Sequence, residues 1–385
     1  MTSHEVLDRI AAAADEIRAE ETASIQQRRL SDNLTKILRD SGVMRLLQPA
    51  RYGGYEADPR VFNQAMYEIG RLSSSAGWVT GVVGIHSWHL GLYDDRAQRE
   101  VWGEDHDTWI CSSYGPAGRA TKVEGGYRLS GRWSFSSGSP QSTWTFVGGM
   151  SDEGDGGAPV YRHFLLPEGD YRMEDVWDTN GLAGTGSNDI VVEDAFVPDY
   201  RSMDVEDLYR LDCPGREVNT SELFSIPWYT IFLNAVVVPL VGMARRTVDE
   251  AIEPLRERRA ATPAYSPLPI THARLAEADA EVDLALLALQ HNLGTVVETL
   301  AAGDEVTLRL RHRAKRDHIM AVNLAVSAAD KAYLSGGPRS IKSSSPIQRV
   351  WRDVHAGQHH AMNVPDLILP QVGDWLTGDV VSYPV

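Results

Sequence analysis

The sequence predicts an α+β protein in which a central β region separates two helical regions. Three changes of pattern along the 385 residues support this prediction. Apolar side chains recur at helical spacing up to Val101, alternate in short runs between about 106 and 200, and return to helical spacing from about 220. The predicted domains are an N-terminal helical domain at 1–105, a central antiparallel β-barrel domain at 106–215 and a C-terminal four-helix bundle at 216–385.

The first helical region is predicted to contain two stretches. An apolar pattern over 4–48 ends at the Pro-Ala-Arg-Tyr-Gly-Gly turn that begins at Pro49. A second pattern covers 58–101, with Asp58 as a capping residue and Pro59 in the first helical turn.

The middle and last regions differ in the length of their segments. The middle region contains short apolar runs separated by Gly, Asp, Ser and Pro clusters, which is typical of an antiparallel β domain. These runs are 109–111, 127–129, 133–135, 143–147, 161–166 and 190–192. The last region contains four long helical segments rich in Ala, Leu, Arg and Glu, at 235–260, 271–302, 305–334 and 346–363.

Composition narrows the functional classes. A net charge of -16 argues against a surface for nucleic acid or for an anionic membrane. The longest apolar run, near 231–243, is interrupted by Asn234 and Pro239 and is too short to span a bilayer. The first residues show no secretory signal, and two cysteines provide no disulfide framework. We therefore expect a cytoplasmic protein with no nucleic-acid or membrane partner.

Residues 131–138, Gly-Arg-Trp-Ser-Phe-Ser-Ser-Gly, combine aromatic rings, hydroxyl groups and a glycine on a predicted strand and turn. Alternation of Trp133 and Phe135 favours a half-buried pleated strand. The Ser-Ser-Gly end would leave hydroxyl and backbone groups free beside a flat ligand. Taken alone, the stretch is equally consistent with an ordinary β-hairpin.

Three motifs resemble the acyl-CoA dehydrogenase superfamily, and the order of the regions fits that family over nearly the whole chain. Residues 181–198 are similar to the segment that closes the family's β domain. Residues 251–259 resemble a helix whose arginine, here Arg258, contacts flavin phosphate in a neighbouring subunit. Residues 351–360, Trp-Arg-Asp-Val-His-Ala-Gly-Gln-His-His, resemble the helix end that faces the flavin. The resemblance implies the family's fold, a flavin cofactor and a homotetramer.

Acyl-CoA dehydrogenases need a carboxylate base that removes a proton from the substrate. The resemblance places this base at one of two positions, which hold Ala361 and Phe232 in this sequence. Residues 223–240 around the second position contain no Asp or Glu. The dehydrogenase reaction therefore lacks its base, although the fold is expected.

Histidine and serine motifs resemble a monooxygenase branch of the superfamily. They are the Phe-Ser-Ser-Gly stretch at 135–138, the histidine-rich helix end at 351–360 and the Trp-to-His stretch at 78–89. The branch includes 4-hydroxyphenylacetate hydroxylase, dibenzothiophene monooxygenase, steroid-ring phenol hydroxylases and sugar nitrososynthases. Its members take reduced flavin from a separate NAD(P)H-dependent reductase and form a C4a-hydroperoxyflavin with O2. The resemblance implies that reductase partner, O2 and reduced FMN or FAD, with FMN as the first choice.

The resemblance also assigns roles to individual residues. It gives Ser137 a hydrogen bond to flavin N5 and places His360 over the flavin C4a, with His359 as the alternative. Ser112 and His86 fall where related hydroxylases hold a substrate phenol, whose proton a neutral histidine can accept. The other residues assigned by position are Trp133, Phe135, Ser136 and Trp144 beside the flavin ring, Arg258 at a flavin phosphate, and Tyr114, Trp88, Trp228, Tyr229 and Phe232 around an aromatic substrate.

Some of these candidate residues also allow a purely structural interpretation. His86 could be a core histidine bonded to a backbone carbonyl, and His89 on the next turn could be structural or substrate-facing. No cysteine or histidine pair with a carboxylate partner has the spacing of a metal site, so no metal is predicted. The favoured function is hydroxylation of a phenol, an indole or a polyketide-like aromatic. Oxygenation of nitrogen or sulfur, a flavin-dependent dehydrogenase or oxidase, and an idle binding protein of the same fold are the alternatives.

Overall fold

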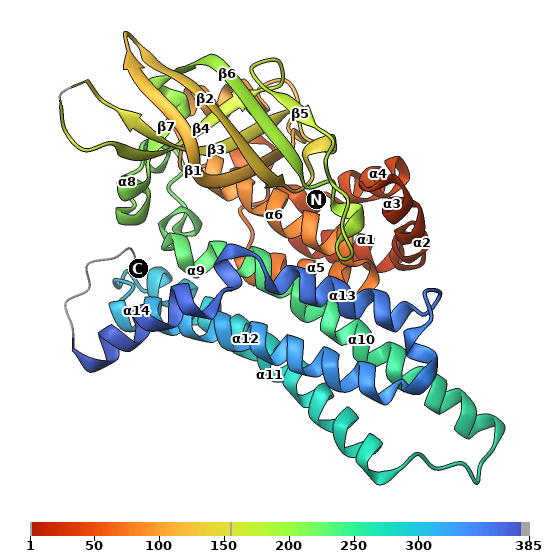
Figure 1. Ribbon diagram of the computed structural model, residues 1–385. Coiled ribbons are helices and arrows are strands. Elements are labelled where there is room, and N and C mark those ends of the chain that lie inside the picture. Colours follow the sequence, from red (N-terminus) through yellow and green to blue (C-terminus); the bar gives the residue numbers. More distant parts are fainter. Residues whose placement is uncertain (1, 155, 379–385) are drawn as a thin grey trace.

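The computed structural model describes residues 2–154 and 156–378, and it is a mixed helix and sheet fold, as the sequence predicts. Figure 1 shows the strands gathered at one end of the molecule and the long C-terminal helices at the other. Helix α6 (Ser74–Leu90) contacts both strand β1 and helix α10, so it joins the two parts. This position makes α6 the central helix of the candidate site.

The N-terminal helices are α1 (Ser3–Ala12), α2 (Ala14–Ala19), α3 (Glu21–Gln27), α4 (Asp32–Ser41), α5 (Pro59–Leu72), α6 and α7 (Asp95–Trp102). The start of α5 follows the sequence prediction, since the Asp58 side chain accepts a hydrogen bond from the Arg60 N–H and Pro59 occupies the first turn. Helix α6 is buried along nearly its whole length. Its side chains are therefore presented to neighbouring elements on all sides.

The strands are β1 (Ile110–Val123), β2 (Gly126–Ser136), β3 (Trp144–Asp152), β4 (Val160–Pro167), β5 (Arg172–Glu174), β6 (Asn188–Pro198) and β7 (Ser202–Asp204). They form one sheet in the order β5-β6-β2-β1-β3-β4-β7. The prediction of an antiparallel domain is wrong at one pairing, because β1 and β3 are parallel. Strand β2 returns along one side of β1, and the chain then crosses to the other side of β1 and starts β3 in the direction of β1.

The register of the sheet separates two faces. Ser112 of β1 pairs with Phe146 of β3, so both side chains lie on one face. The adjacent residues Cys111 and Val147 point to the other face, where they pack with Trp133 in a second hydrophobic core. The Ser112 face is the one that meets α6, whereas the second core holds the β domain together.

The C-terminal helices are α8 (Val205–Arg210), α9 (Trp228–Phe232), α10 (Asn234–Ala261), α11 (Pro269–Ala301), α12 (Leu308–Ser335), α13 (Pro346–Gln358) and α14 (Pro365–Thr377). Helices α10 to α13 pack side by side, and the end of α10 and the start of α11 project beyond the rest of the molecule (Figure 1). The sequence predicted four long segments at these places.

The apolar run near 231–243 lies in a helical segment that is longer than the sequence analysis assumed. The segment Trp228–Ala261 is long and apolar enough to cross a bilayer by length and composition, yet 94% of its apolar window is buried inside the protein. Its apolar character is thus explained by packing against α5, α6, α12 and α13.

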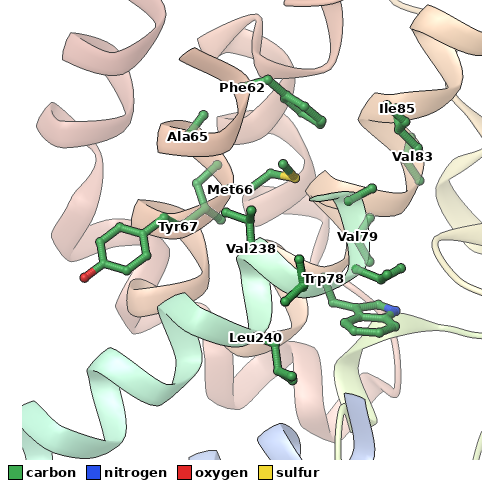
Figure 2. Close-up of a cluster of buried hydrophobic side chains, with 14 of the residues drawn as sticks. Phe62, Ala65, Met66, Tyr67, Trp78, Val79, Val83, Ile85, Val238 and Leu240 are labelled. Carbon is green, nitrogen blue, oxygen red and sulfur yellow. The ribbon is translucent and has the colours of Figure 1, made fainter. Parts of the chain in front are cut away.

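Close packing of helices fixes the position of α6. Side chains of α5, α6 and α10, among them Met66, Val79 and Val238, form the apolar cluster shown in Figure 2. A Cβ atom at Gly81 of α6 would lie 2.1 Å from the carbonyl oxygen of Ala235 in α10. Because only a glycine permits this approach, the contact holds α6 against α10 at a fixed depth.

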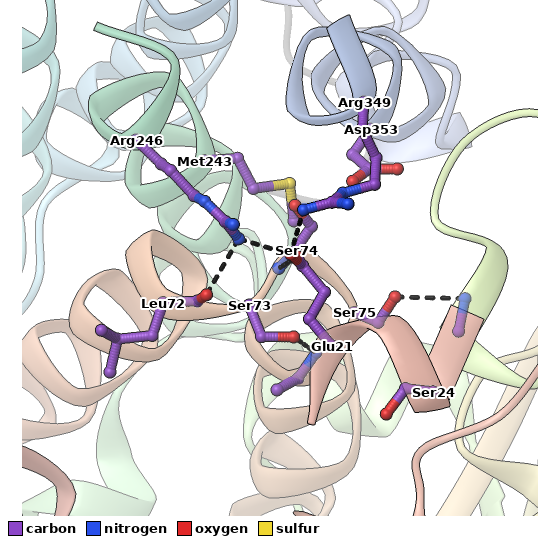
Figure 3. A network of polar contacts seen from close by, with 12 residues as sticks. Glu21, Ser24, Leu72, Ser73, Ser74, Ser75, Met243, Arg246, Arg349 and Asp353 are labelled. Carbon is purple, nitrogen blue, oxygen red and sulfur yellow. Dashed lines mark hydrogen bonds and ion pairs between the residues drawn. The ribbon is translucent and has the colours of Figure 1, made fainter. Parts of the chain in front are cut away.

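A buried ionic network ties α3, α6, α10 and α13 together (Figure 3). Glu21, which is 2% exposed, accepts hydrogen bonds from Arg246 at 2.8 Å and from Arg349 at 2.7 Å. Arg246 also donates to the carbonyl oxygen of Leu72 at 2.9 Å. Asp353 on α13 accepts from the Leu182 N–H at 2.6 Å, and burial raises the pKa of its carboxyl to about 6.

We expect Glu21→Gln to lower the free energy of unfolding by about 3 kcal/mol, because it leaves buried arginine charge without its carboxylate. Chemical unfolding monitored by circular dichroism measures the change. Glu16→Gln, on the exposed side of α2, is the matched control and should shift stability by less than about 0.5 kcal/mol. Equal stability of the two variants would show that the network contributes nothing.

Candidate active site

Helix α6 presents two histidines to the face of the sheet that carries Ser112. His86 and His89 are both buried, at 1% and 0% exposure. Aromatic and imidazole rings from three strands and from α9 surround them. These surrounding rings are Tyr114 of β1, Phe146 of β3, His163 of β4, and Trp228 and Phe232 of α9. We call this group the aromatic cage.

His86 is locked in one orientation by the backbone of β1. Its Nδ1 lies 2.5 Å from the carbonyl oxygen of Ile110, which can only accept, so Nδ1 carries the proton. Burial lowers the pKa of His86 to about 4, against the opposing effect of this hydrogen bond, so the ring is neutral at pH 7. Its Nε2 is buried and has no hydrogen-bond partner among the described residues. That nitrogen is therefore a lone-pair acceptor for a ligand.

His89 lies one helical turn further along α6. Its Nδ1 is 2.7 Å from the hydroxyl oxygen of Tyr114. Burial lowers the pKa of His89 well below its usual value and raises that of Tyr114 well above its usual value. A side-chain hydrogen bond between Ser112 and Tyr114 works against the second shift. Ser112, Tyr114 and His89 thus form a connected polar chain inside the aromatic cage.

The walls of the cage include the position at which the resemblance to acyl-CoA dehydrogenases would place a base. Phe232 stands there and stacks on Trp228 with ring centroids 4.0 Å apart and an angle of 17° between the planes. Trp88, which the sequence analysis predicts to contact the substrate, packs against Trp228 with the ring centroids 5.6 Å apart. Its N–H donates a hydrogen bond to the carbonyl oxygen of Leu223 at 2.9 Å. Tyr229 lies outside the cage, where its hydroxyl pairs with that of Tyr209 at 3.1 Å.

A second group of candidate residues surrounds Trp78, near the start of α6. The Trp78 N–H donates to the Ser137 hydroxyl at 3.1 Å, and a 2.7 Å hydrogen bond joins Ser137 to Ser187. Trp78 precedes His86 by eight residues, a rise of about 12 Å along the helix. The two groups are therefore held at a fixed separation by one helix.

His360 belongs to this second group and His359 does not. The His360 ring lies 5.7 Å from Trp78, edge to face, whereas His359 is exposed. The Met362 N–H donates to Nδ1 of His360 at 3.2 Å, so the neutral ring carries its proton on Nε2 and offers a donor there. Burial lowers the pKa of His360 to about 4, which keeps the ring neutral at pH 7. His355, also close in sequence, bonds to Asp330 at 3.0 Å instead.

The rings of Phe135 and Trp177 form an aromatic surface beside Ser137, which we call the ledge. Phe135 has a φ of 69° and is 72% exposed, and its ring meets Trp177 edge to face at 6.2 Å. A positive φ in a bulky residue is strained backbone, and such strain gathers at functional sites. The adjacent Ser136 hydroxyl is buried without a partner in the described part of the chain. The ledge offers a flat apolar surface next to one unsatisfied hydroxyl, that of Ser136.

Trp133 is not part of this ledge, which corrects the sequence prediction. It is 1% exposed in the core of the β domain, and its N–H donates to the carbonyl of Gly148 at 2.7 Å. The register of β2 against β6 shifts between Trp133 and Ser136, so Trp133 and Phe135 do not share a face. The flavin contact at Trp144 stays a prediction; in the structure the Arg201 guanidinium lies 5.1 Å from the centre of that ring.

Arg258 lies in the last turn of α10, and the end of this helix projects beyond the rest of the molecule (Figure 1). It is exposed, and its guanidinium stacks on Tyr265 at 4.1 Å. Within this single chain it does not meet Ser137 or His360. The prediction that it contacts flavin in a neighbouring subunit is thus untested.

Sequence reasoning missed three residues of these two groups: Trp78 as the link between Ser137 and His360, Trp177 in the ledge, and His163 in the cage. Trp177 has a recognisable signal, a lone large aromatic in the polar stretch 174–180. Trp78 opens the 78–89 motif, although that motif gave it no role of its own, and His163 has no signal because it sits in an apolar run typical of a buried strand.

Residues 2–154 and 156–378 contain no group of three or more His, Cys, Asp or Glu arranged to hold a metal ion. Ala361, the other position at which a dehydrogenase base is expected, is exposed in a short 3-10 helix. A hollow of about 510 Å³ lies between α12 and α14 and includes none of the predicted site residues. The chemistry of the site therefore rests on the two histidine groups along α6.

The chain is similar to known proteins over most of its length. The family model described as acyl-CoA dehydrogenase, C-terminal domain, matches residues 235–365. Over 352 residues the chain is 41% identical to the oxygenase subunit HsaA of a flavin-dependent monooxygenase from Rhodococcus jostii, covering 91% of each protein. It is 30% identical to the oxygenase component of an FADH2-dependent resorcinol hydroxylase from Rhizobium, covering 97% of this chain and 94% of that one.

Among solved structures, the chain superposes on the crystal structure of 3-HSA hydroxylase from Rhodococcus sp. RHA1 with a TM-score of 0.96. The two chains are 39% identical, and the match covers 99% of this chain and 98% of the other. Both the sequence and the structure comparison thus span nearly the whole molecule.

Proposed function

Because this chain belongs to the family of oxygenase components of flavin-dependent monooxygenases, we propose that it hydroxylates a neutral phenol held between His86 and Ser112. The protein is an enzyme, an oxidoreductase. The observation that carries the proposal is the fixed orientation of His86, whose Ile110 hydrogen bond leaves an acceptor nitrogen inside an aromatic cage. A phenol is the ligand class that offers a flat ring and one acidic hydroxyl to such a site.

The residues around Trp78 fit a flavin ring. Phe135 and Trp177 supply a flat apolar ledge, Ser137 a buried hydroxyl and His360 a fixed N–H donor. A reduced flavin bound there would supply the activation of O2. Ser137 and His360 would hold protons beside it, and the buried walls of α6 would exclude water.

The cage favours a substrate without charge. His86 and His163 are kept neutral by burial, which lowers their pKa values to about 4 and about 3, and the remaining walls are aromatic rings. An acidic or basic substituent buried there would lack a charged partner, which is costly. Sulfur oxygenation makes no use of the His86 acceptor, and an amine N–H gives up its proton to a neutral imidazole far less readily than a phenol does, so phenol hydroxylation is the better match.

The proposal includes two partners. A separate NAD(P)H-dependent reductase would supply reduced FMN or FAD, because relatives are named oxygenase subunits or components of multi-part enzymes. A second copy of the chain would receive the exposed Arg258 at a flavin phosphate, within a homotetramer. We also propose a cytoplasmic location, where both free cysteines stay reduced.

We expect Phe135→Ser to weaken binding of reduced flavin by about 3- to 10-fold, since an aromatic contact is worth about 0.5–1.5 kcal/mol. Anaerobic titration of protein into reduced FMN or FAD, followed by fluorescence, measures the affinity. Phe196→Ser, at an exposed phenylalanine on β6, is the matched control and should leave the affinity unchanged. Equal affinities for both variants would show that Phe135 does not contact the flavin.

The proposed function is tested by mixing the protein anaerobically with reduced FMN or FAD and admitting air. The expected result is an oxygen-adduct absorbance that outlasts that of free flavin, followed by hydroxylation of an added phenol. Reoxidation at the rate of free flavin would reject the monooxygenase mechanism. Tightly bound oxidised flavin that turns over without a reductase would support the dehydrogenase or oxidase alternative.

A further inference from the structure

Three buried hydroxyl groups connect the proposed flavin position to the backbone at Leu182. They belong to Ser137, Ser187 and Thr185, which are 8%, 3% and 0% exposed. The Ser137 and Ser187 oxygens lie 2.7 Å apart, and the Ser187 and Thr185 oxygens are separated by the same 2.7 Å. The Thr185 hydroxyl lies 2.9 Å from the carbonyl oxygen of Leu182. We call these three groups the hydroxyl chain, of which only Ser137 has a role in the function proposed above.

The direction of every hydrogen bond in the hydroxyl chain is fixed from its Leu182 end. A carbonyl oxygen can only accept, so Thr185 donates its single hydroxyl proton to Leu182. The Thr185 oxygen can then only accept from Ser187, and Ser187 uses its proton there. Ser137 must therefore donate its own proton to Ser187. The opposite order would leave the Thr185 and Leu182 oxygens 2.9 Å apart with no proton between them, which is costly in a buried site.

Leu182 is itself held in place by two further hydrogen bonds. Its N–H donates to the buried carboxylate of Asp353 at 2.6 Å, and its carbonyl oxygen also accepts the Trp177 N–H at 3.1 Å. Because these contacts hinder rotation of Leu182, the hydroxyl chain keeps its acceptor and its direction. Trp177 is one of the two rings of the ledge, so the ledge and the hydroxyl chain are anchored at the same residue.

At its other end the hydroxyl chain determines what Ser137 can offer to a ligand. The Ser137 oxygen already accepts the Trp78 N–H at 3.1 Å, and its proton is donated to Ser187. One lone pair remains, so Ser137 faces a ligand as an acceptor and not as a donor. N5 of a reduced flavin carries an N–H, whereas N5 of an oxidised flavin carries a lone pair. Only the reduced ring can therefore form a hydrogen bond with Ser137 while the hydroxyl chain stays intact.

We infer that Thr185 and Ser187 are positioning residues that make the Ser137 hydroxyl a fixed acceptor, and that this polarity selects reduced over oxidised flavin. The inference rests on the proposed function and on the resemblance that places Ser137 at N5. An oxidised ring would meet a second lone pair there, or would take the Ser137 proton and leave the Ser137 and Ser187 oxygens 2.7 Å apart without one. Either arrangement weakens binding of the oxidised form. This selection suits an oxygenase whose flavin is reduced on a separate protein.

The test compares the dissociation constants of reduced and oxidised flavin, measured with FMN and with FAD on the full-length protein. The wild type is expected to bind the reduced form about 10-fold more tightly or better. Ser187→Ala and Thr185→Val each release the proton of Ser137 for donation to an oxidised N5, so each lowers this preference by about 3- to 10-fold. The change appears as tighter binding of oxidised flavin, which general damage to the site would not produce.

Two controls separate hydrogen-bond direction from packing. Thr185→Ser keeps the hydroxyl and should keep the wild-type preference. Ser139→Ala removes a neighbouring buried hydroxyl, which donates to the Gly186 carbonyl at 3.0 Å and is not part of the hydroxyl chain. Its preference for reduced flavin should also equal that of the wild type.

A second measurement needs no variant. 5-Deaza-FMN carries a C–H in place of N5, so its oxidised form presents no lone pair to Ser137. Wild-type protein should bind oxidised 5-deaza-FMN about 3-fold more tightly than oxidised FMN, or better. Ser187→Ala should remove this difference, because its Ser137 can donate to the N5 of FMN.

Three outcomes would overturn the inference. Wild-type protein could bind both redox states, or oxidised FMN and oxidised 5-deaza-FMN, with equal affinity. The preference could stay unchanged in both folded variants, Ser187→Ala and Thr185→Val. It could also fall only through weaker binding of reduced flavin, which would make Thr185 and Ser187 packing residues. In contrast, failure of the wild type to bind flavin in either redox state would reject the proposed flavin site, and the inference with it.

Discussion

His86→Phe is expected to lower the rate of phenol hydroxylation by about 100-fold or more while leaving the oxygen adduct as long-lived as in the wild type. A positioned proton acceptor contributes about 10²- to 10⁴-fold to a rate, and phenylalanine fills the same space without an acceptor. His86 lies about 12 Å along α6 from Trp78, so the residues around the flavin ring should be undisturbed. Product yield per reduced flavin and adduct lifetime, measured in the same stopped-flow experiment, separate the two effects.

His86→Gln is the conservative counterpart. The glutamine side chain can place its amide oxygen, an acceptor, near the position of the His86 Nε2, so this variant should recover part of the product yield. Loss of both yield and adduct lifetime in His86→Phe would mean that this residue supports the flavin site. If neither the product yield nor the adduct lifetime fell in His86→Phe, His86 would be a structural histidine of the core.

The same residue sets an expected pH dependence. The pKa of His86 is lowered to about 4 in the folded protein, so the ring is protonated, and its acceptor lost, only as the pH falls through that value. Between pH 5 and 8 this group should therefore impose no limb on the yield of hydroxylated product. A limb near pH 6.5 that disappears in His86→Gln would show that the ring is solvated in the working enzyme.

Ser137→Ala and His360→Ala are the second pair of changes with large expected effects. Each should shorten the lifetime of the oxygen adduct by about 10- to 100-fold, because each removes a hydrogen-bonding group beside the proposed flavin position. Ser137→Ala also leaves the buried Trp78 N–H without its acceptor. The measurement is the decay of the adduct absorbance in the absence of substrate.

His359→Ala is the matched control for His360→Ala, because the neighbouring histidine is exposed and lies away from Trp78. Its adduct should decay at the wild-type rate. If His359→Ala shortened the lifetime and His360→Ala did not, the assignment of the two histidines would be reversed. An unchanged lifetime in Ser137→Ala would remove the serine from the flavin site.

Local pattern was sufficient for much of the fold. Apolar spacing located the helices, and the Asp58-Pro59 cap located the start of α5, because both signals depend on near neighbours in the chain. The parallel pairing of β1 with β3 could not be predicted, since strand order is decided by tertiary packing. The shift of register after Trp133 could not be predicted from the sequence either, and it separates Trp133 and Phe135, which were expected to share one face.

Candidate site residues could be proposed from the sequence where a motif resembles a family. His86, Ser112, Ser137 and the His359/His360 pair were selected in this way, and their roles stay predictions. Burial then distinguished His360 from His359, which no spacing could do. Trp78, His163 and the His89 to Tyr114 contact emerged only from the structure, because they depend on which faces of α6 and the sheet meet.

The close approach of α6 to α10 at Gly81 fixes the position of α6, so the length of this helix sets the distance between the Trp78 group and the His86 group. Each residue of a helix adds about 1.5 Å and about 100° of rotation, so one inserted residue between Trp78 and His86 would point the acceptor away from the oxygen donor. Short insertions there would misalign the two groups, while the side chains of β4 and α9 form a wall of the cage that lies on other elements. Divergence in substrate choice should accumulate on that wall and leave the length of α6 constant.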